Sequence, residues 1–251
     1  MNARLLAFPL LVALVVSQAP AAAEVIDRDF PLNGAGTLRL NVSGHIHILT
    51  DAPQGTVKLH VVDYGPSTPA LRFDGVRNGA RFTLTISGPT QSVLPFVGAS
   101  GYETEVHVPR NVRIDLREFG GRVRVDNVTA PAQYYAAKGS IEVADSRAAL
   151  TAEADNGDIT VGSAHGNIML TVGNGTSHAT LARDFSGNLV RMEASNGAMT
   201  LLVPPGFRAN FDVTAANGKA TNPLRSSGKS PVVFMLSESG DITVATASQT
   251  P

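Results

Sequence analysis

The sequence predicts an all-β, single-domain parallel β-helix (a β-solenoid) with a right-handed winding and a less regular N-terminal β cap. Three observations predict this fold. A glycine returns at nearly constant steps between residues 121 and 240, apolar and polar residues alternate on both sides of each glycine, and the composition is rich in glycine and β-branched residues. A repeat of about 20 residues with period-two alternation is typical of one turn of a solenoid.

Residues 1–23 have the pattern of a cleaved signal peptide. Arg4 precedes an apolar stretch from Leu5 to Val16, and Ala21-Ala22-Ala23 supplies an A-x-A cleavage site. The apolar stretch is short of the ~20 residues that span a bilayer. We therefore expect export to the periplasm or the extracellular space, with no transmembrane segment in the mature chain. The absence of cysteine rules out a lipoprotein anchor at the N-terminus.

Residues 24–120 are predicted to form an N-terminal β region that begins the solenoid and caps it. The phrase Gly44-His45-Ile46-His47-Ile48 has the Gly-x-Ile-x-Ile/Val form of the later repeats. A loop is predicted at Pro89–Gly101. The strands expected here are Thr37–Asn41, His45–Leu49, Val57–Val62, Ala80–Ile86, Thr104–Val108 and Val112–Leu116.

Residues 121–244 are predicted to be the regular solenoid repeats, and residues 245–251 a flexible tail. The repeats begin at Gly121, Gly139, Gly157, Gly175, Gly197, Gly218 and Gly240. The residues two and four places after each glycine are largely apolar, so one face of that strand is expected to be buried. Each turn is expected to pair in parallel with the next one in sequence order, and the usual hand of parallel crossovers is right-handed.

Asparagine precedes the glycine at four successive corners. The structural residues singled out on this basis are Asn156, Asn174, Asn196 and Asn217, with Gly139, Gly157, Gly175, Gly197 and Gly218. Asn-Gly is compatible with separate hairpin turns, because both residues tolerate positive φ. The alternative is a ladder of asparagine side chains that hydrogen-bond along the solenoid axis, as amides do in stacked strands.

The chain resembles the bacterial "putative adhesin" domains of unknown function over most of residues 30–245. The similarity is carried by three motifs: Val108-Pro109-Arg110-Asn111-Val112, Val203-Pro204-Pro205-Gly206-Phe207 and Gly240-Asp241-Ile242-Thr243-Val244. The resemblance implies an exported β-solenoid with an envelope or extracellular role. It supplies no catalytic residues.

Composition excludes several kinds of chemistry. Without cysteine there are no disulfides, thiolate metal sites or cysteine nucleophiles. The formal net charge of −1 disfavours nucleic acid as a partner. His45 and His47 share one face of a strand and could chelate a metal, and Glu103, Glu105 and His107 form a similar set. A solvated strand face explains both sets more simply, so no cofactor is expected.

The function predicted is that of an exported, non-catalytic β-solenoid with an adhesin-like binding role or a structural role in the envelope. The expected partners are an envelope component, a glycan or a protein. The alternative is a carbohydrate-active β-helix enzyme, either a polysaccharide lyase or a hydrolase. Its candidate carboxylates are Asp158, Asp184, Glu193 and Asp212. Their spacing shows no catalytic pattern.

Overall fold

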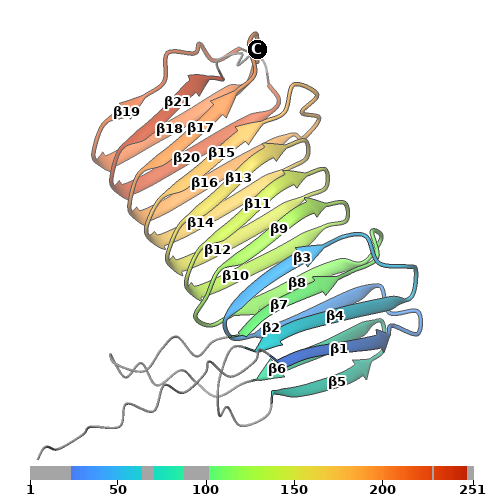
Figure 1. Ribbon diagram of the computed structural model, residues 1–251. Coiled ribbons are helices and arrows are strands. Elements are labelled where there is room, and N and C mark those ends of the chain that lie inside the picture. The colour runs from blue at the N-terminus through green and yellow to red at the C-terminus, as the bar shows by residue number, and fades with distance from the viewer. Residues whose placement is uncertain (1–23, 64–70, 88–101, 228, 248–251) are drawn as a thin grey trace, which may run out of the picture.

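The computed structural model describes residues 24–63, 71–87, 102–227 and 229–247, and these residues form two large β-sheets and no helix (Figure 1). Sheet A has eleven strands, in the order β1 (Glu24–Pro31), β4 (Thr56–Asp63), β7 (Tyr102–His107), β3 (His45–Leu49), β9 (Val123–Val128), β11 (Ile141–Ser146), β13 (Ile159–Ala164), β15 (Ser177–Leu181), β17 (Met199–Val203), β21 (Ile242–Thr246) and β19 (Ala220–Thr221). Sheet B has ten strands, in the order β18 (Asn210–Asn217), β20 (Val232–Ser239), β16 (Leu189–Asn196), β14 (Ile168–Asn174), β12 (Leu150–Asn156), β10 (Ala132–Lys138), β8 (Arg113–Glu118), β2 (Thr37–Val42), β6 (Arg81–Ser87) and β5 (Arg72–Asn78).

The repeat unit is one strand of sheet B, a glycine corner and one strand of sheet A. Successive units pair in parallel within each sheet. Antiparallel pairs occur at the N-terminal end, between β1 and β4, β4 and β7, and β5 and β6. Alternate residues of both sheets point into one shared apolar core, as Ile141 and Val143 of β11 and Ala152 of β12 illustrate with at most 1% exposure. The all-β class predicted from the repeat is therefore confirmed, and so are the predicted inward columns, except in the unit β18–β19, where none of their residues is fully buried.

The order of the last two units differs from the sequence-order pairing predicted. The unit β20–β21 lies between β16–β17 and β18–β19, so the chain passes over one position and then returns to fill it (Figure 1). The inward residues of the inserted unit, among them Met235 and Ile242, are fully buried. Those of the terminal unit are less apolar, and Ala220 is exposed. Burial of apolar surface is more favourable for the unit with neighbours on both sides, which explains the exchange.

The Gly44 phrase does join the stack of repeat units. Strands β2 and β3 pair with β8 and β9, although about 75 residues separate them along the chain. The six strands predicted in this region are present, with ends that agree to within two residues. Two strands, β1 and β5, were not predicted. Their residues are mostly exposed, so they lack the apolar alternation that marks the other strands.

The asparagines at the corners are hydrogen-bonded to one another. Nδ2 of Asn174 donates to Oδ1 of Asn156, and Nδ2 of Asn196 donates to Oδ1 of Asn174, both at 3.0 Å. Asn217 lies beyond this row because the exchanged unit places Ser239 next to Asn196, and its Nδ2 donates to the carbonyl oxygen of Glu238. The stabilising role of the row stays a prediction.

Some boundaries predicted from the sequence lie outside the described residues: the signal peptide at 1–23, the loop at Pro89–Gly101 and the end of the tail at 248–251. Strand β21 continues to Thr246, and the N–H of Ala247 donates to the carbonyl oxygen of Val203 at 2.8 Å, so paired structure extends past residue 244. The right-handed winding and the capping role of residues 24–120 stay predictions. Within the described part of the chain, no helix has the length and apolar character needed to cross a membrane.

Candidate functional site

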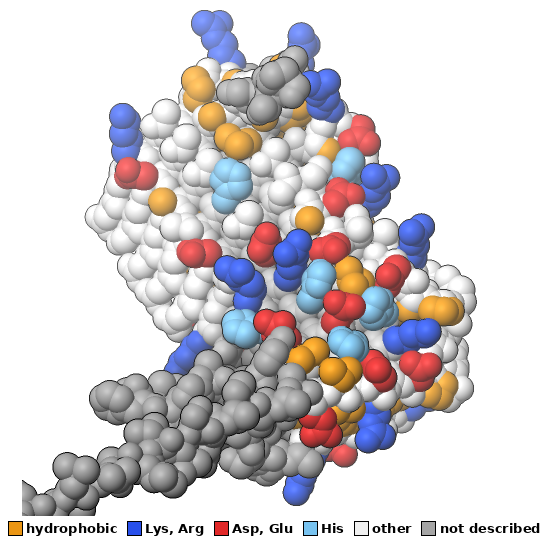
Figure 2. Space-filling view, in the orientation of Figure 1, with side chains coloured by type: hydrophobic (Ala, Val, Ile, Leu, Met, Phe, Trp, Pro, Cys, Tyr) orange, Lys and Arg blue, Asp and Glu red, His pale blue; other side chains and the backbone are white. Residues whose placement is uncertain are grey.

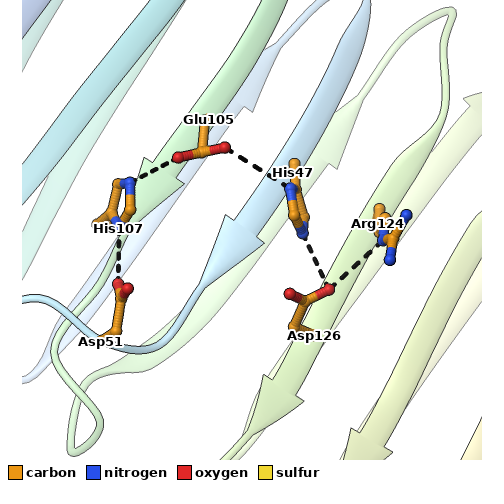
Figure 3. Close-up of polar contacts among 6 residues, drawn as sticks. All are labelled: His47, Asp51, Glu105, His107, Arg124 and Asp126. Atoms are coloured by element: carbon orange, nitrogen blue, oxygen red, sulfur yellow. Dashed lines mark hydrogen bonds and ion pairs between the residues drawn. The ribbon is translucent and has the colours of Figure 1, made fainter.

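Histidine, acidic and basic side chains gather on the outward face of sheet A near its N-terminal end (Figure 2). Six of them form a continuous row of polar contacts across strands β7, β3 and β9 (Figure 3). We call this row the histidine–carboxylate network; its members are His47, Asp51, Glu105, His107, Arg124 and Asp126.

Strand alternation and strand register together build the network. In β3 the side chains of Ile46 and Ile48 are buried, so His45 and His47 point outward. Strand β3 pairs with β7 on one side and with β9 on the other, which places Glu105 and Arg124 directly beside His47. Neighbouring strands are about 4.8 Å apart, so side chains in one row are within hydrogen-bonding reach.

The histidines are held between carboxylates. Nε2 of His47 lies 2.9 Å from Oδ1 of Asp126, and its Nδ1 lies 3.8 Å from Oε2 of Glu105. His107 has a carboxylate at each ring nitrogen, with Nδ1 2.6 Å from Asp51 and Nε2 2.7 Å from Glu105. Only a doubly protonated imidazole ring donates at both nitrogens, so this arrangement favours the imidazolium form.

The pKa shifts follow from these contacts. Burial lowers the pKa of His107, but the hydrogen bonds to Asp51 and Glu105 outweigh it, and the net pKa lies above the ordinary value. Burial raises the pKa of Asp126, but His47 and then Arg124 outweigh it and hold the net pKa below the ordinary value. The network is therefore a set of fixed, partly exposed charges of both signs.

An open groove of about 770 Å³ lies beside the network. One end is lined by Glu103, Glu105 and His60, and the other end by Arg122 and Lys138, with further residues between them. Residues of β4, β7, β3 and β9 line the groove, together with the glycine corners at Gly121 and Gly139. The groove thus offers hydrogen-bond acceptors at one end and cationic donors at the other.

The two histidines proposed as metal ligands do share the outward face, but their contacts differ. Nδ1 of His45 accepts the N–H of Arg122 at 3.2 Å, whereas His47 contacts Asp126 and Glu105. Glu105 and His107 contact each other, and Glu103 lines the groove. Among the residues that the structure describes, no group of three histidine, aspartate or glutamate side chains is arranged to hold a metal ion.

The site also contains four residues that were not predicted to belong to it: Asp51, His60, Arg124 and Asp126. Arg124 and Asp126 have an outward-facing pattern that could have marked them as exposed. Their proximity to His47 depends on the pairing of β3 with β9, which no local pattern reveals.

The carboxylates considered for a hydrolase or lyase have separate structural partners. Asp158 accepts hydrogen bonds from the N–H and the hydroxyl of Thr176, both at 2.7 Å. Asp184 contacts His165 at 2.6 Å, and Glu193 pairs with Arg191 on sheet B. Asp212 lies on β18 of sheet B. These four side chains are not brought into one site.

The carboxyl group of Glu118 has a pKa above its ordinary value. Burial raises this pKa, and its effect is larger than that of the hydrogen bonds from the N–H groups of Gly120, Gly44 and Gly121, which lower it. Its exposure is 0%, because it projects from the end of β8 into the core beside Val42 and Ala136. A general acid must reach its substrate, and this one does not reach the surface.

No family model and no curated protein matches this chain. Solved bacterial structures are similar to this chain, and three of them are as follows. One, described as a "putative adhesin" from Bacteroides fragilis, has 14% sequence identity and a TM-score of 0.51, covering 89% of this chain and 97% of its own. A "putative cell adhesion protein" from Clostridium sporogenes has 12% identity and a TM-score of 0.42, covering 90% and 100%. A "putative lipid binding protein" from Parabacteroides distasonis has 11% identity and a TM-score of 0.33, covering 89% and 97%.

At 14% identity, the similarity to the Bacteroides structure concerns the fold alone.

Proposed function

We propose that this chain is an exported, non-catalytic, adhesin-like protein that binds a polar component of the bacterial envelope through the outward face of sheet A. The observation that carries the proposal is the groove of about 770 Å³ with the histidine–carboxylate network beside it. The signal-peptide pattern of residues 1–23 supports export. The description of the Bacteroides structure as an adhesin agrees with a binding role.

A rigid sheet suits such a role because it holds binding groups in place before the partner arrives. The strands under the groove pack on residues that are almost fully buried, such as Ile46, Val106 and Val123. The ion pairs of the network restrict the motion of its side chains on the outward face of the sheet. Hydrogen-bond donors and acceptors, and charges of both signs, line the groove. This lining favours a polar partner such as a glycan or a peptide over an apolar one.

The carbohydrate-active enzyme stays the alternative, and the separation of the candidate carboxylates argues against it. Glycoside hydrolysis requires two carboxyl groups that flank the scissile bond. Asp158, Asp184 and Glu193 instead have partners of their own in different parts of the fold.

The test is retention of purified residues 24–251 on bacterial envelope fractions and on soluble polysaccharides, with product release measured in the same incubations. Ser140→Tyr places a ring at the groove, since Ser140 lines it. Thr151→Tyr on β12 of sheet B is the matched control, because it adds a ring to a partly exposed residue of the other sheet. We expect retention of the native chain and of Thr151→Tyr, and loss of retention for Ser140→Tyr.

Equal retention of both variants would contradict the placement of the binding face. Release of oligosaccharide that stops when the carboxylates are replaced would favour the enzyme. Export is tested by N-terminal sequencing of the chain recovered outside the cytoplasm, where we expect Glu24 as the first residue. An intact Met1 in a cytoplasmic fraction would contradict export.

A further inference from the structure

Four hydrogen-bond donors meet at one end of the groove. The N–H of Ile46 donates to the carbonyl oxygen of Arg122 at 2.9 Å, and the N–H of Val123 donates to that of Ser140 at 2.8 Å. His45, Arg122 and Ser140 therefore occupy one level on three adjacent strand beginnings, about 4.8 Å apart. Lys138 lies two residues before Ser140, at the corner, and also lines the groove.

The ring of His45 presents a donor to the groove. Its Nδ1 accepts the backbone N–H of Arg122 at 3.2 Å, so this nitrogen carries no hydrogen in the neutral ring. The hydrogen then lies on Nε2, which becomes a donor.

Within the described residues, the two cations at this end have no carboxylate partner. Among the described residues, the side chains of Arg122 and Lys138 take part in none of the ion pairs, whereas Arg124 of the same strand pairs with Asp126. One unit further along sheet A, Asp158 is hydrogen-bonded to Thr176. Arg122 and Lys138 are both exposed. Their charge is thus available to a ligand.

We propose that these residues, His45, Arg122, Lys138 and Ser140, bind the oxyanion of an acidic glycan, either a carboxylate or a phosphate group. This inference rests on the proposed function and names the chemistry of the partner. A guanidinium group binds the two oxygens of a carboxylate or phosphate in parallel, and an ammonium group adds a point charge. The serine hydroxyl and Nε2–H of His45 complete a set of donors.

The acidic end of the groove favours a glycan that carries few negative charges. Glu103 and Glu105 on β7 line that end, with Glu103 beside His45 in the strand register, and both would repel a second anion placed close by. Their oxygens accept hydrogen bonds from sugar hydroxyl groups. The groove is also far larger than a single oxyanion requires, so it leaves room for the sugar rings that carry it.

Calorimetric titration of residues 24–251 tests the inference with three probes: trigalacturonate for the carboxylate, mannose 6-phosphate for the phosphate and maltotriose as the neutral sugar. The test variant is Arg122→Ala with Lys138→Ala. The matched control is Arg113→Ala with Lys219→Ala, which removes the same charge from two exposed positions away from the groove. Circular dichroism melting verifies that both variants fold.

We expect at least one anionic probe to bind, with affinity about tenfold or more weaker for the test variant, because two charge-assisted contacts are lost. The control should stay within about twofold of the native chain, since distant exposed charges are screened by salt. Binding of the carboxylate probe alone or of the phosphate probe alone supports the inference and identifies the group.

Equally tight binding of maltotriose, an equal loss in the control, or no binding of either anionic probe would overturn the inference. Retention on an envelope fraction that neither anionic probe displaces would also overturn it, yet would leave the proposed function standing. Absence of retention on every envelope fraction would count against the proposed function itself.

Discussion

Replacing the corner glycine Gly157 with alanine should destabilise the protein more than the same replacement at an ordinary turn. The backbone of Gly157 has φ +156°, and a Cβ added there would lie 1.8 Å from the carbonyl oxygen of Gly139 in the neighbouring repeat unit. Real Cβ atoms do not approach backbone atoms closer than 3.0 Å. The two corners would therefore have to separate by about 1.2 Å, the difference between these distances.

The cost follows from the contacts that such a shift breaks. Two backbone hydrogen bonds join these units. The N–H of Gly139 donates to the carbonyl oxygen of Asn156 at 3.0 Å, and the N–H of Ile141 donates to the carbonyl oxygen of Asp158 at 2.8 Å. Stretched by about 1.2 Å, neither stays a hydrogen bond, and each is worth about 1 kcal/mol net. The unfavourable φ adds about 1–3 kcal/mol. The expected loss in the free energy of unfolding is about 3–5 kcal/mol.

Urea denaturation followed by circular dichroism measures this loss, with Gly79→Ala as the control. Gly79 also has positive φ, at +58°, but a Cβ there has no neighbour within 4 Å. Only the left-handed backbone cost remains, about 1–2 kcal/mol. If both variants lose the same stability, the close approach of the corners is not what requires glycine, and this reasoning is refuted.

Three further predictions concern single side chains. Asn174→Ala removes two amide hydrogen bonds of the corner row and should lower the free energy of unfolding by about 1–2 kcal/mol; an unchanged thermal unfolding curve would contradict a stabilising ladder. Tyr134→Phe should raise stability by about 1 kcal/mol in urea unfolding, because the buried hydroxyl has no hydrogen-bond partner among the described residues and is costly to desolvate; a loss of stability would show that the hydroxyl is satisfied. His107→Ala should destabilise the protein more at pH 5.5 than at pH 8.5. The raised pKa means that protonated His107 stabilises the fold below its unfolded pKa and loses this effect as the pH rises through the folded pKa. Equal losses at both pH values would contradict this.

The inward and outward faces of the strands could be predicted from the sequence, because alternation is a local property of each strand. Ile46, Ile141 and Met235 are buried as their columns indicated. The outward placement of His45 and His47 followed from the same rule. Their partners did not, since Asp126 reaches His47 only through the pairing of strands far apart in the chain.

The repeat in the sequence determined the all-β class, the faces of the strands and the corners that require glycine, all of which depend on residues within a few positions of one another. Only the tertiary structure decided which strands are neighbours. The insertion of β20 and β21 before β18 and β19, and the pairing of β3 with β9, depend on the free energy of burying whole repeat units. The candidate site is built across such pairings, and for that reason the tertiary structure was needed to identify it.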